Sequence, residues 1–240
     1  MRPLALLAPF VFSVMSAAPA LAAGSMQMIG HGEVQASPDT AYVTSGVTSQ
    51  GTTAKEALDA NTRDMSALIG VLKDAGIADK DIQTSGFSVN PNYVYSDARD
   101  ANGYQLPPKI VGYTVTNQVT VHVRDLGTLG TMLDKEVSVG ANTINGINFA
   151  VEDPAELYNE ARRQAFADAK GKADLYAEAS GAELGAIQNI SESQGASQPP
   201  QPYLYKATAA AQDRAAPVPV EAGQLTFTID VSVAWDLVQR

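Results

Sequence analysis

The residue types that most often carry out chemistry are scarce in this chain. It contains no cysteine and two histidines, His31 and His122, which excludes thiol redox chemistry, thiolate nucleophiles and cysteine-type zinc sites. Both histidines fall in predicted strands, at positions that alternate away from the apolar face, and we interpret both as exposed. A two-histidine metal site needs the rings to converge with a carboxylate, and the spacing gives no support for this. We therefore predict no catalytic residues, no cofactor and no metal.

Glycine and serine patterns have structural explanations. The chain has no Gly-x-Gly-x-x-Gly run, no Walker-type loop and no Gly-x-Ser-x-Gly elbow. Spacing alone never excludes a Ser-His-Asp triad, but Ser85-Gly86 lies inside a predicted strand. Gly30-x-Gly32 also lies in a strand, where it indicates a bulge or a close backbone contact.

An acidic cluster at Asp97 and Asp100, near Asn102 and Gly103, resembles a calcium loop only faintly. It lacks the full ligand spacing and the terminal glutamate of such a loop. We interpret it as the solvated tip of a hairpin.

Arg162 is the charged residue that fits its surroundings least well. Its helical angle puts it within the apolar arc of a long helix, whereas Arg163 points to solvent. We favour snorkelling at the helix edge. The alternative is a buried ion pair, within the fold or across a subunit interface. One turn apart on the same helix, Asp168 and Lys172 are predicted to form an ordinary surface pair.

The elements that would position these residues follow from apolar periodicity and capping signals. Capping residues at Thr53, Asp125 and Asp153 begin three helices, which end at Gly76, Gly140 and Gly181. The predicted strands are Gln27–Val34, Thr40–Gln50, Ile82–Tyr95, Lys109–Val123, a short strand around Ile147–Val151, Leu184–Ile190, and Leu225–Trp235. The order predicts an α+β fold: one compact unit of two related halves, each of mainly antiparallel sheet with helices packed on one face.

Two polar residues interrupt otherwise apolar strand faces. Ser45 interrupts the face of Ala41, Val43 and Val47, and Asn117 interrupts that of Lys109–Val123. At Asn117 we expect a bulge, or a buried side chain bonded to backbone. The final strand alternates strictly, so Trp235 should be buried.

The first 22 residues have the three parts of a secretory signal peptide: a positive start, a short apolar stretch and small residues before Ala23. Removing them, and with them Arg2, changes the formal net charge from −10 to −11. Such acidity argues against nucleic acid and anionic lipid as partners. The mature domain would be residues 23–240. Within it, five prolines and an alanine run predict a mobile arm at residues 193–223.

Five segments of the mature chain, in order, carry a resemblance to a known family. They are similar to the SIMPL-domain family, most closely to the periplasmic immunogenic, or outer-membrane antigen, proteins within it. The segments are GHGEVQASPDTAYV (30–43), IQTSGFSVNPNY (82–93), IVGYTVTNQVTV (110–121), GANTINGINFAVEDP (140–154) and EARRQAFADAKGKADLYAEASG (160–181).

The resemblance implies an exported, non-enzymatic α+β protein that forms homo-oligomers, and some members of the family are linked to oxidative-stress defence. It supplies no catalytic residues. The leading hypothesis is therefore a periplasmic, self-assembling structural or interaction protein without a known small-molecule ligand. Peripheral association with the outer membrane stays open. The alternatives are an oxidative-stress scavenger or chaperone-like protein and, more weakly, a channel-like assembly.

We expect the exported protein to begin at Ala23 or within a few residues of it, because Ala20 and Ala22 suit the signal peptidase pocket. N-terminal sequencing of the exported protein measures this directly. Retention of residues 1–22 would contradict the prediction.

Overall fold

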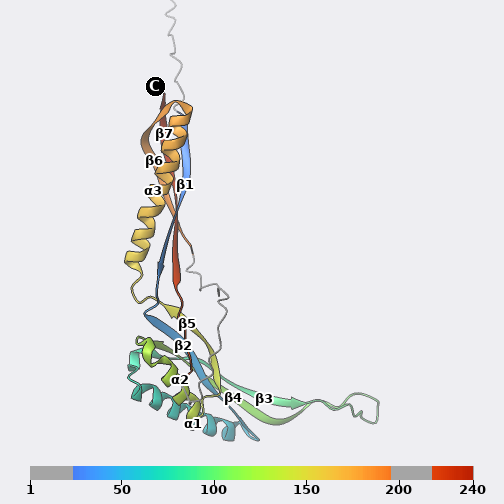
Figure 1. The fold of residues 1–240 in the computed structure, drawn as a ribbon. Helices are drawn as coiled ribbons and strands as arrows, with labels where there is room; N and C mark the ends of the chain where they lie inside the picture. Colours follow the sequence, from blue (N-terminus) through green and yellow to red (C-terminus); the bar gives the residue numbers. More distant parts are fainter. Residues whose placement is uncertain (1–23, 196–217, 240) are drawn as a thin grey trace, which may run out of the picture.

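A computed structural model of the chain describes residues 24–195 and 218–239. It is elongated rather than the compact unit expected, with two sheets placed end to end and a long hairpin projecting sideways (Figure 1). The strands are β1 (Gly24–Ala36), β2 (Thr40–Gly51), β3 (Ile82–Val94), β4 (Lys109–Val123), β5 (Thr143–Ala150), β6 (Ala182–Gln194) and β7 (Leu225–Gln239). The helices are α1 (Ala54–Asp74), α2 (Leu129–Ser138) and α3 (Ala155–Ser180), with short 3-10 turns η1 (Asp79–Asp81) and η2 (Leu126–Thr128).

The predicted α+β class and antiparallel pairing are confirmed. One sheet has the order β1-β7-β6, and α3 packs on it; the other has the order β3-β4-β2-β5, and α1 and α2 pack on it. All strand pairs are antiparallel. The sheets do not follow the two halves of the sequence, because the first strand pairs with the last one. β1 continues into β2 after three residues and so joins the two sheets.

The close backbone contact expected at Gly30-x-Gly32 is where α3 approaches β1. A Cβ atom on Gly30 would lie 1.9 Å from the carbonyl oxygen of Ala165, and one on Gly32 would lie 1.9 Å from that of Ala161. The buried face of α3 consists of small residues: Ala161, Ala165, Ala169, Ala173 and Ala177. Helix and strand backbones therefore touch with only hydrogen atoms and methyl groups between them.

The capping signal of α1, the terminal glycines and the strict alternation of the last strand are confirmed. Asp125 caps η2, which precedes α2. Asp153 accepts a hydrogen bond from the Ala155 amide, but the N-cap of α3 is Pro154. Thr53 and Glu56 form the predicted capping box of α1, and Gly76, Gly140 and Gly181 all have positive φ. Trp235 is buried, with 3% of its surface exposed. It packs in a core with Ile229, Val231, Val233 and the alanines of α3.

Several apolar residues are exposed, although the periodicity of the sequence puts them on the apolar faces of the helices and of β4. Leu58 and Val137 lie where the amphipathic faces of α1 and α2 turn away from the sheet, and they are 38% and 56% exposed. Tyr176, near the end of α3, is 57% exposed. The buried face of this helix is formed by its alanines, and the aromatic residues of α3 that pack on this core are Tyr158 and Phe166. Val111 is 52% exposed because it lies beyond Tyr113, the last β4 residue paired with β2.

The predicted arm at residues 193–223 falls largely on residues 196–217, which lie outside the described residues, as does the predicted signal peptide. At its start, β6 continues to Gln194, and the Gly195 amide donates to the Thr228 carbonyl. At its end, Val220 packs against the core of the four-stranded sheet. Both ends of the segment are therefore attached to the fold.

Gly32→Ala should destabilise the protein by about 1–3 kcal/mol or more, because the new methyl group meets helix backbone that cannot rotate away. Gly171→Ala, on α3, is the matched control. No described atom lies within 4 Å of the Cβ it adds, so it should stabilise the helix by about 0.5–1 kcal/mol. Urea unfolding measures both. Equal stability of the two variants would mean that α3 does not touch β1 as described.

Candidate functional site

Four polar residues meet where β4 leaves the four-stranded sheet. Asp81 comes from η1, after α1. His122 lies at the end of β4, Arg124 directly follows that strand, and Glu152 follows β5. His122 faces away from the core because its neighbours Val121 and Val123 face into it. The cluster therefore links the start of β3, the end of β4 and the end of β5, all in the four-stranded sheet.

Arg124 bridges the two carboxylates of this cluster. Its Nη2 lies 3.0 Å from Asp81 Oδ1 and its Nε lies 3.3 Å from Asp81 Oδ2, while its Nη1 donates to Glu152 Oε1. These hydrogen bonds lower the pKa of Asp81 and raise that of Arg124, most strongly through the pair they form together. Both groups are held in their charged forms at neutral pH.

The interpretation of His122 as an exposed strand histidine is wrong. Its side chain is 12% exposed, because its ring stacks on Tyr42 of β2 at 4.4 Å and 8°. Its Nε2 lies 3.0 Å from Glu152 Oε2 and its Nδ1 lies 3.6 Å from Asp81 Oδ1. The Nε2 contact is close but is not aligned as a hydrogen bond.

His31 matches the prediction better. Its side chain is 53% exposed, and its Nδ1 lies 2.8 Å from Asp230 Oδ1 on the neighbouring strand β7. The two histidines belong to different sheets and do not converge. Within residues 24–195 and 218–239, no group of three or more His, Cys, Asp or Glu side chains is placed to hold a metal ion.

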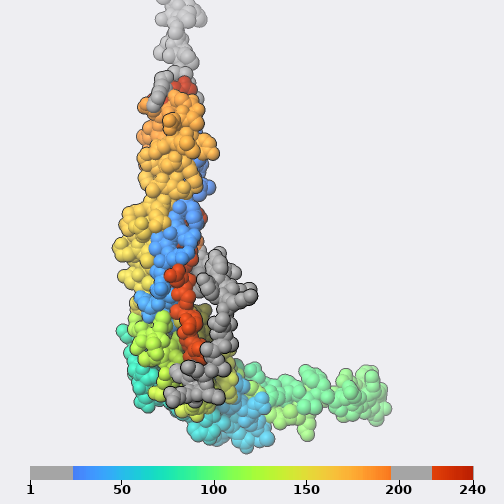
Figure 2. Space-filling view, in the orientation of Figure 1, coloured from blue at the N-terminus to red at the C-terminus, as the bar shows by residue number. Residues whose placement is uncertain are grey.

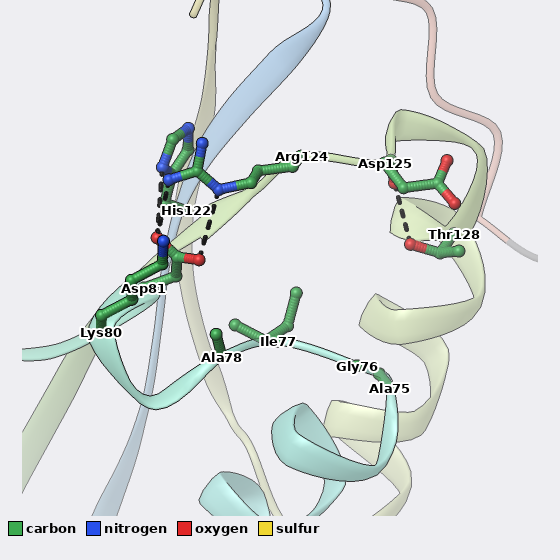
Figure 3. A pocket seen from close by; sticks show the side chains of 10 residues that line it. All are labelled: Ala75, Gly76, Ile77, Ala78, Lys80, Asp81, His122, Arg124, Asp125 and Thr128. Carbon is green, nitrogen blue, oxygen red and sulfur yellow. Dashed lines mark hydrogen bonds and ion pairs between the residues drawn. The ribbon is translucent and has the colours of Figure 1, made fainter.

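An open pocket of about 390 Å³ lies beside the charged cluster. Figure 3 shows Asp81, His122 and Arg124 on one side, Asp125 and Thr128 across from them, and the turn at Ala75–Ala78 below. Arg124 is already paired with carboxylates, and Asp125 accepts a hydrogen bond from the Gly127 amide as the predicted cap. Asp81, Arg124 and Glu152 are already bonded to one another, so the arrangement is suited to tying strand ends together.

The polar interruption at Ser45 has a buried partner that the sequence analysis missed. Ser45 Oγ donates to Glu136 Oε2 of α2, and both residues are completely buried. Glu136 Oε1 has no hydrogen-bond partner among the described residues. Burial raises the pKa of Glu136, and the bond from Ser45 opposes this less strongly. The available signal was the spacing of Glu136 from Leu129, Met132 and Leu133, which puts it on the apolar face of α2.

Asn117, the second polar interruption, faces the same core without a side-chain partner for its Oδ1 among the described residues. The expected bulge is on the neighbouring strand, between Thr84 and Gly86 of β3, and the β4 strand passes Asn117 without a break. Asn117 Oδ1 is buried without a partner in the part of the chain that the structure describes. The bonding of a buried amide to strand backbone is made instead by Asn61 of α1, which the sequence analysis missed: its Nδ2 donates to the Val47 carbonyl oxygen at 2.9 Å.

Arg162 forms an ion pair within the chain. Its guanidinium lies 2.9 Å from Glu192 Oε2 of β6 and bonds Asn159 at 2.9 Å, and its side chain is 41% exposed. The pairing lowers the pKa of Glu192. Neither predicted alternative describes Arg162 fully. The ion pair lies within the fold, as the buried-pair alternative required, but Arg162 is partly exposed at the helix edge, as the snorkelling alternative required.

Asp168 and Lys172 do more than the ordinary surface pair that was predicted. Lys172 Nζ lies 2.7 Å from Asp168 Oδ2, and this bond lowers the pKa of Asp168. The same carboxylate accepts from the His31 amide at 2.8 Å, and the same amine donates to the Ile29 carbonyl at 3.0 Å. β1 is an edge strand, so this pair satisfies backbone groups that strand pairing leaves open.

The acidic cluster at Asp97 and Asp100 is a hairpin tip, as predicted. Asp100 Oδ1 accepts from the amides of Asn102 and Tyr104, each at 2.9 Å. Ser85-Gly86 lies within β3, also as predicted.

Comparison with known proteins decides the family. The SIMPL family, described as a protein of unknown function (DUF541), matches residues 26–235. The chain belongs to the SIMPL family.

Several named relatives fall within the same comparison. The chain is 38% identical over 214 residues to the 26 kDa periplasmic immunogenic protein of Brucella melitensis, covering 87% of this chain and 82% of the relative. The same protein of Brucella abortus matches equally. Uncharacterized protein YggE of Edwardsiella ictaluri is 26% identical over 209 residues, 87% of this chain and 84% of that one.

No helix in the described ranges is long and apolar enough to cross a membrane.

Glu136→Gln should make the stability of this SIMPL protein less dependent on pH. The folded-state pKa of Glu136 is raised, so the contribution of its neutral form is complete below the unfolded pKa and is lost as pH rises through the folded pKa. The glutamine variant should therefore be the more stable protein at pH 8, with the difference shrinking toward pH 4. Urea unfolding across this range measures the effect.

Glu178→Gln, on the exposed face of α3, is the control and should follow the wild-type pH profile. If Glu136→Gln also follows it, the buried carboxyl does not titrate in the way described.

Proposed function

We propose that this SIMPL-family chain is an exported, periplasmic structural or interaction protein that assembles with copies of itself. The observation that carries the proposal is an uncovered apolar strip on the projecting β3–β4 hairpin. Export is supported by the names of the Brucella relatives, which are called periplasmic.

The strip continues the core face of the sheet beyond its helices. Val89 pairs with the buried Val115, so both side chains lie on the same face. Phe87 and Tyr93 alternate with Val89 along β3, and Tyr93 pairs with Ile110. We call Phe87, Val89, Tyr93 and Ile110 the apolar strip; they are 58%, 40%, 49% and 43% exposed.

Covering this strip would be energetically favourable. An isolated two-stranded hairpin is marginally stable in water, and an edge strand such as β3 has backbone groups open to pairing. Contiguous exposed apolar surface commonly marks an interaction site. The strip therefore combines open backbone groups with side chains that gain from leaving water.

A second copy suits this surface because β3 carries no charged residue. Copies of a chain with a formal net charge of −10 repel one another, so contact is least costly where charge is absent. No contact among the described residues favours the scavenger or channel-like alternatives.

Phe87→Ser combined with Tyr93→Ser should lower the solution mass at micromolar concentration, because both changes remove apolar area from the strip. Light scattering should give the wild-type protein a mass well above that of the monomer. Leu175→Ser combined with Tyr176→Ser, on an exposed part of α3, should leave the wild-type mass unchanged. A monomeric wild-type protein, or a strip variant of unchanged mass, would refute the proposal.

A further inference from the structure

The loop at the tip of the hairpin satisfies its own polar groups. Arg99 donates to the Gly103 carbonyl at 2.7 Å, and Asp100 Oδ1 accepts from two backbone amides of the loop. The Leu106 amide donates to the Ala98 carbonyl at 3.0 Å, and the Asp100 amide donates to the Tyr104 carbonyl at 2.8 Å. Much of the backbone at the tip would therefore need no new partner on leaving water.

The side chains that this loop presents to solvent are aromatic and aliphatic. Tyr95 and Tyr104 are 75% and 74% exposed, the two highest values among the large hydrophobic residues of the described chain, and Leu106 is 41% exposed. Tyrosine has an apolar ring and a polar hydroxyl, a combination favoured where a membrane meets water. None of these three residues is among the four that define the apolar strip.

Charge and position distinguish the tip from the rest of the molecule. In residues 95–109, both ends included, Asp97 and Asp100 balance Arg99 and Lys109, whereas the whole chain has a formal net charge of −10. Figure 2 shows the hairpin projecting clear of the body of the molecule, with its tip at the far end. The neutral aromatic end can therefore reach a surface while the acidic body stays away from it.

We propose that the loop carrying Tyr95, Tyr104 and Leu106 is a shallow anchor that inserts into the headgroup region of zwitterionic phospholipid. This inference does not depend on self-assembly, although several tips on one assembly would bind more tightly than one. The acidic body makes the anchor selective: phosphatidylcholine should be bound better than a surface rich in phosphatidylglycerol, because the body is repelled by anionic lipid.

The test is sedimentation of the full-length protein with phosphatidylcholine vesicles. Wild-type protein should bind, Tyr95→Ser combined with Tyr104→Ser should bind about tenfold more weakly, and the Leu175→Ser, Tyr176→Ser control should bind like wild type. Vesicles containing phosphatidylglycerol should bind less protein at low salt, and added salt should reduce that difference. Circular dichroism establishes that each variant is folded.

Three results would overturn the inference. Wild-type protein could fail to sediment with phosphatidylcholine, or the tip variant could bind as well as wild type. The tip variant could also lower the solution mass in the absence of vesicles, which would assign Tyr95 and Tyr104 to contact with a second copy. The strip variant, Phe87→Ser combined with Tyr93→Ser, separates this inference from the proposed function. It tests self-assembly while the anchor residues Tyr95 and Tyr104 are intact.

Discussion

The antiparallel pairing of β1 with β7 is the constraint on which the rest of the structure depends. It runs from Gly24 opposite Leu237 to Ala36 opposite Leu225 and joins the two ends of the described chain. Because β1 continues into β2, the same ladder fixes how the second sheet follows the first. The glycines of β1 then allow α3 to lie against this ladder at backbone distance. Without this ladder β1 would have no partner strand in its sheet, and α3 would lose the strand that it approaches most closely.

Local signals predicted the elements well, and non-local contacts account for what they missed. Capping boxes, terminal glycines and alternation depend on residues close in sequence, so α1, β7 and the buried Trp235 followed from them. The partner of Ser45 lies in a different element, and nothing near position 45 identifies Glu136 as that partner. His122 was misjudged for the same reason, since Tyr42 and Asp81 cover it from other elements. The grouping of β1 with β6 and β7 is likewise a property of distant strands.

The polar residues that interrupt the apolar strand faces do face the core, but the residues near them could be identified only in the structure. Ser45 and Asn117 each mark a place where a helix brings a polar side chain into the core of the four-stranded sheet or close to it. An unpartnered buried oxygen is costly, and Glu136 limits that cost by retaining its proton more strongly. These positions specify how α1 and α2 sit on the sheet, because a shift of either helix would leave more polar atoms without partners.

The hairpin exists because two strands are longer than the strand beside them. β2 ends at Gly51, opposite Tyr113, and the chain turns at once into α1. A Cβ atom on Gly112 would lie 2.9 Å from the Gly51 carbonyl oxygen, so the backbones are in close contact where the hairpin departs. Beyond this point β4 pairs with β3 alone among the described strands, and α1 extends away from the hairpin (Figure 1). Exposure of the hairpin faces follows from this mismatch in length, and the sequence places apolar side chains on one of them. To cover the hairpin, β2 would have to be longer or α1 would have to lie elsewhere. The turn after Gly51 prevents both, because it ends β2 and starts α1 at that point.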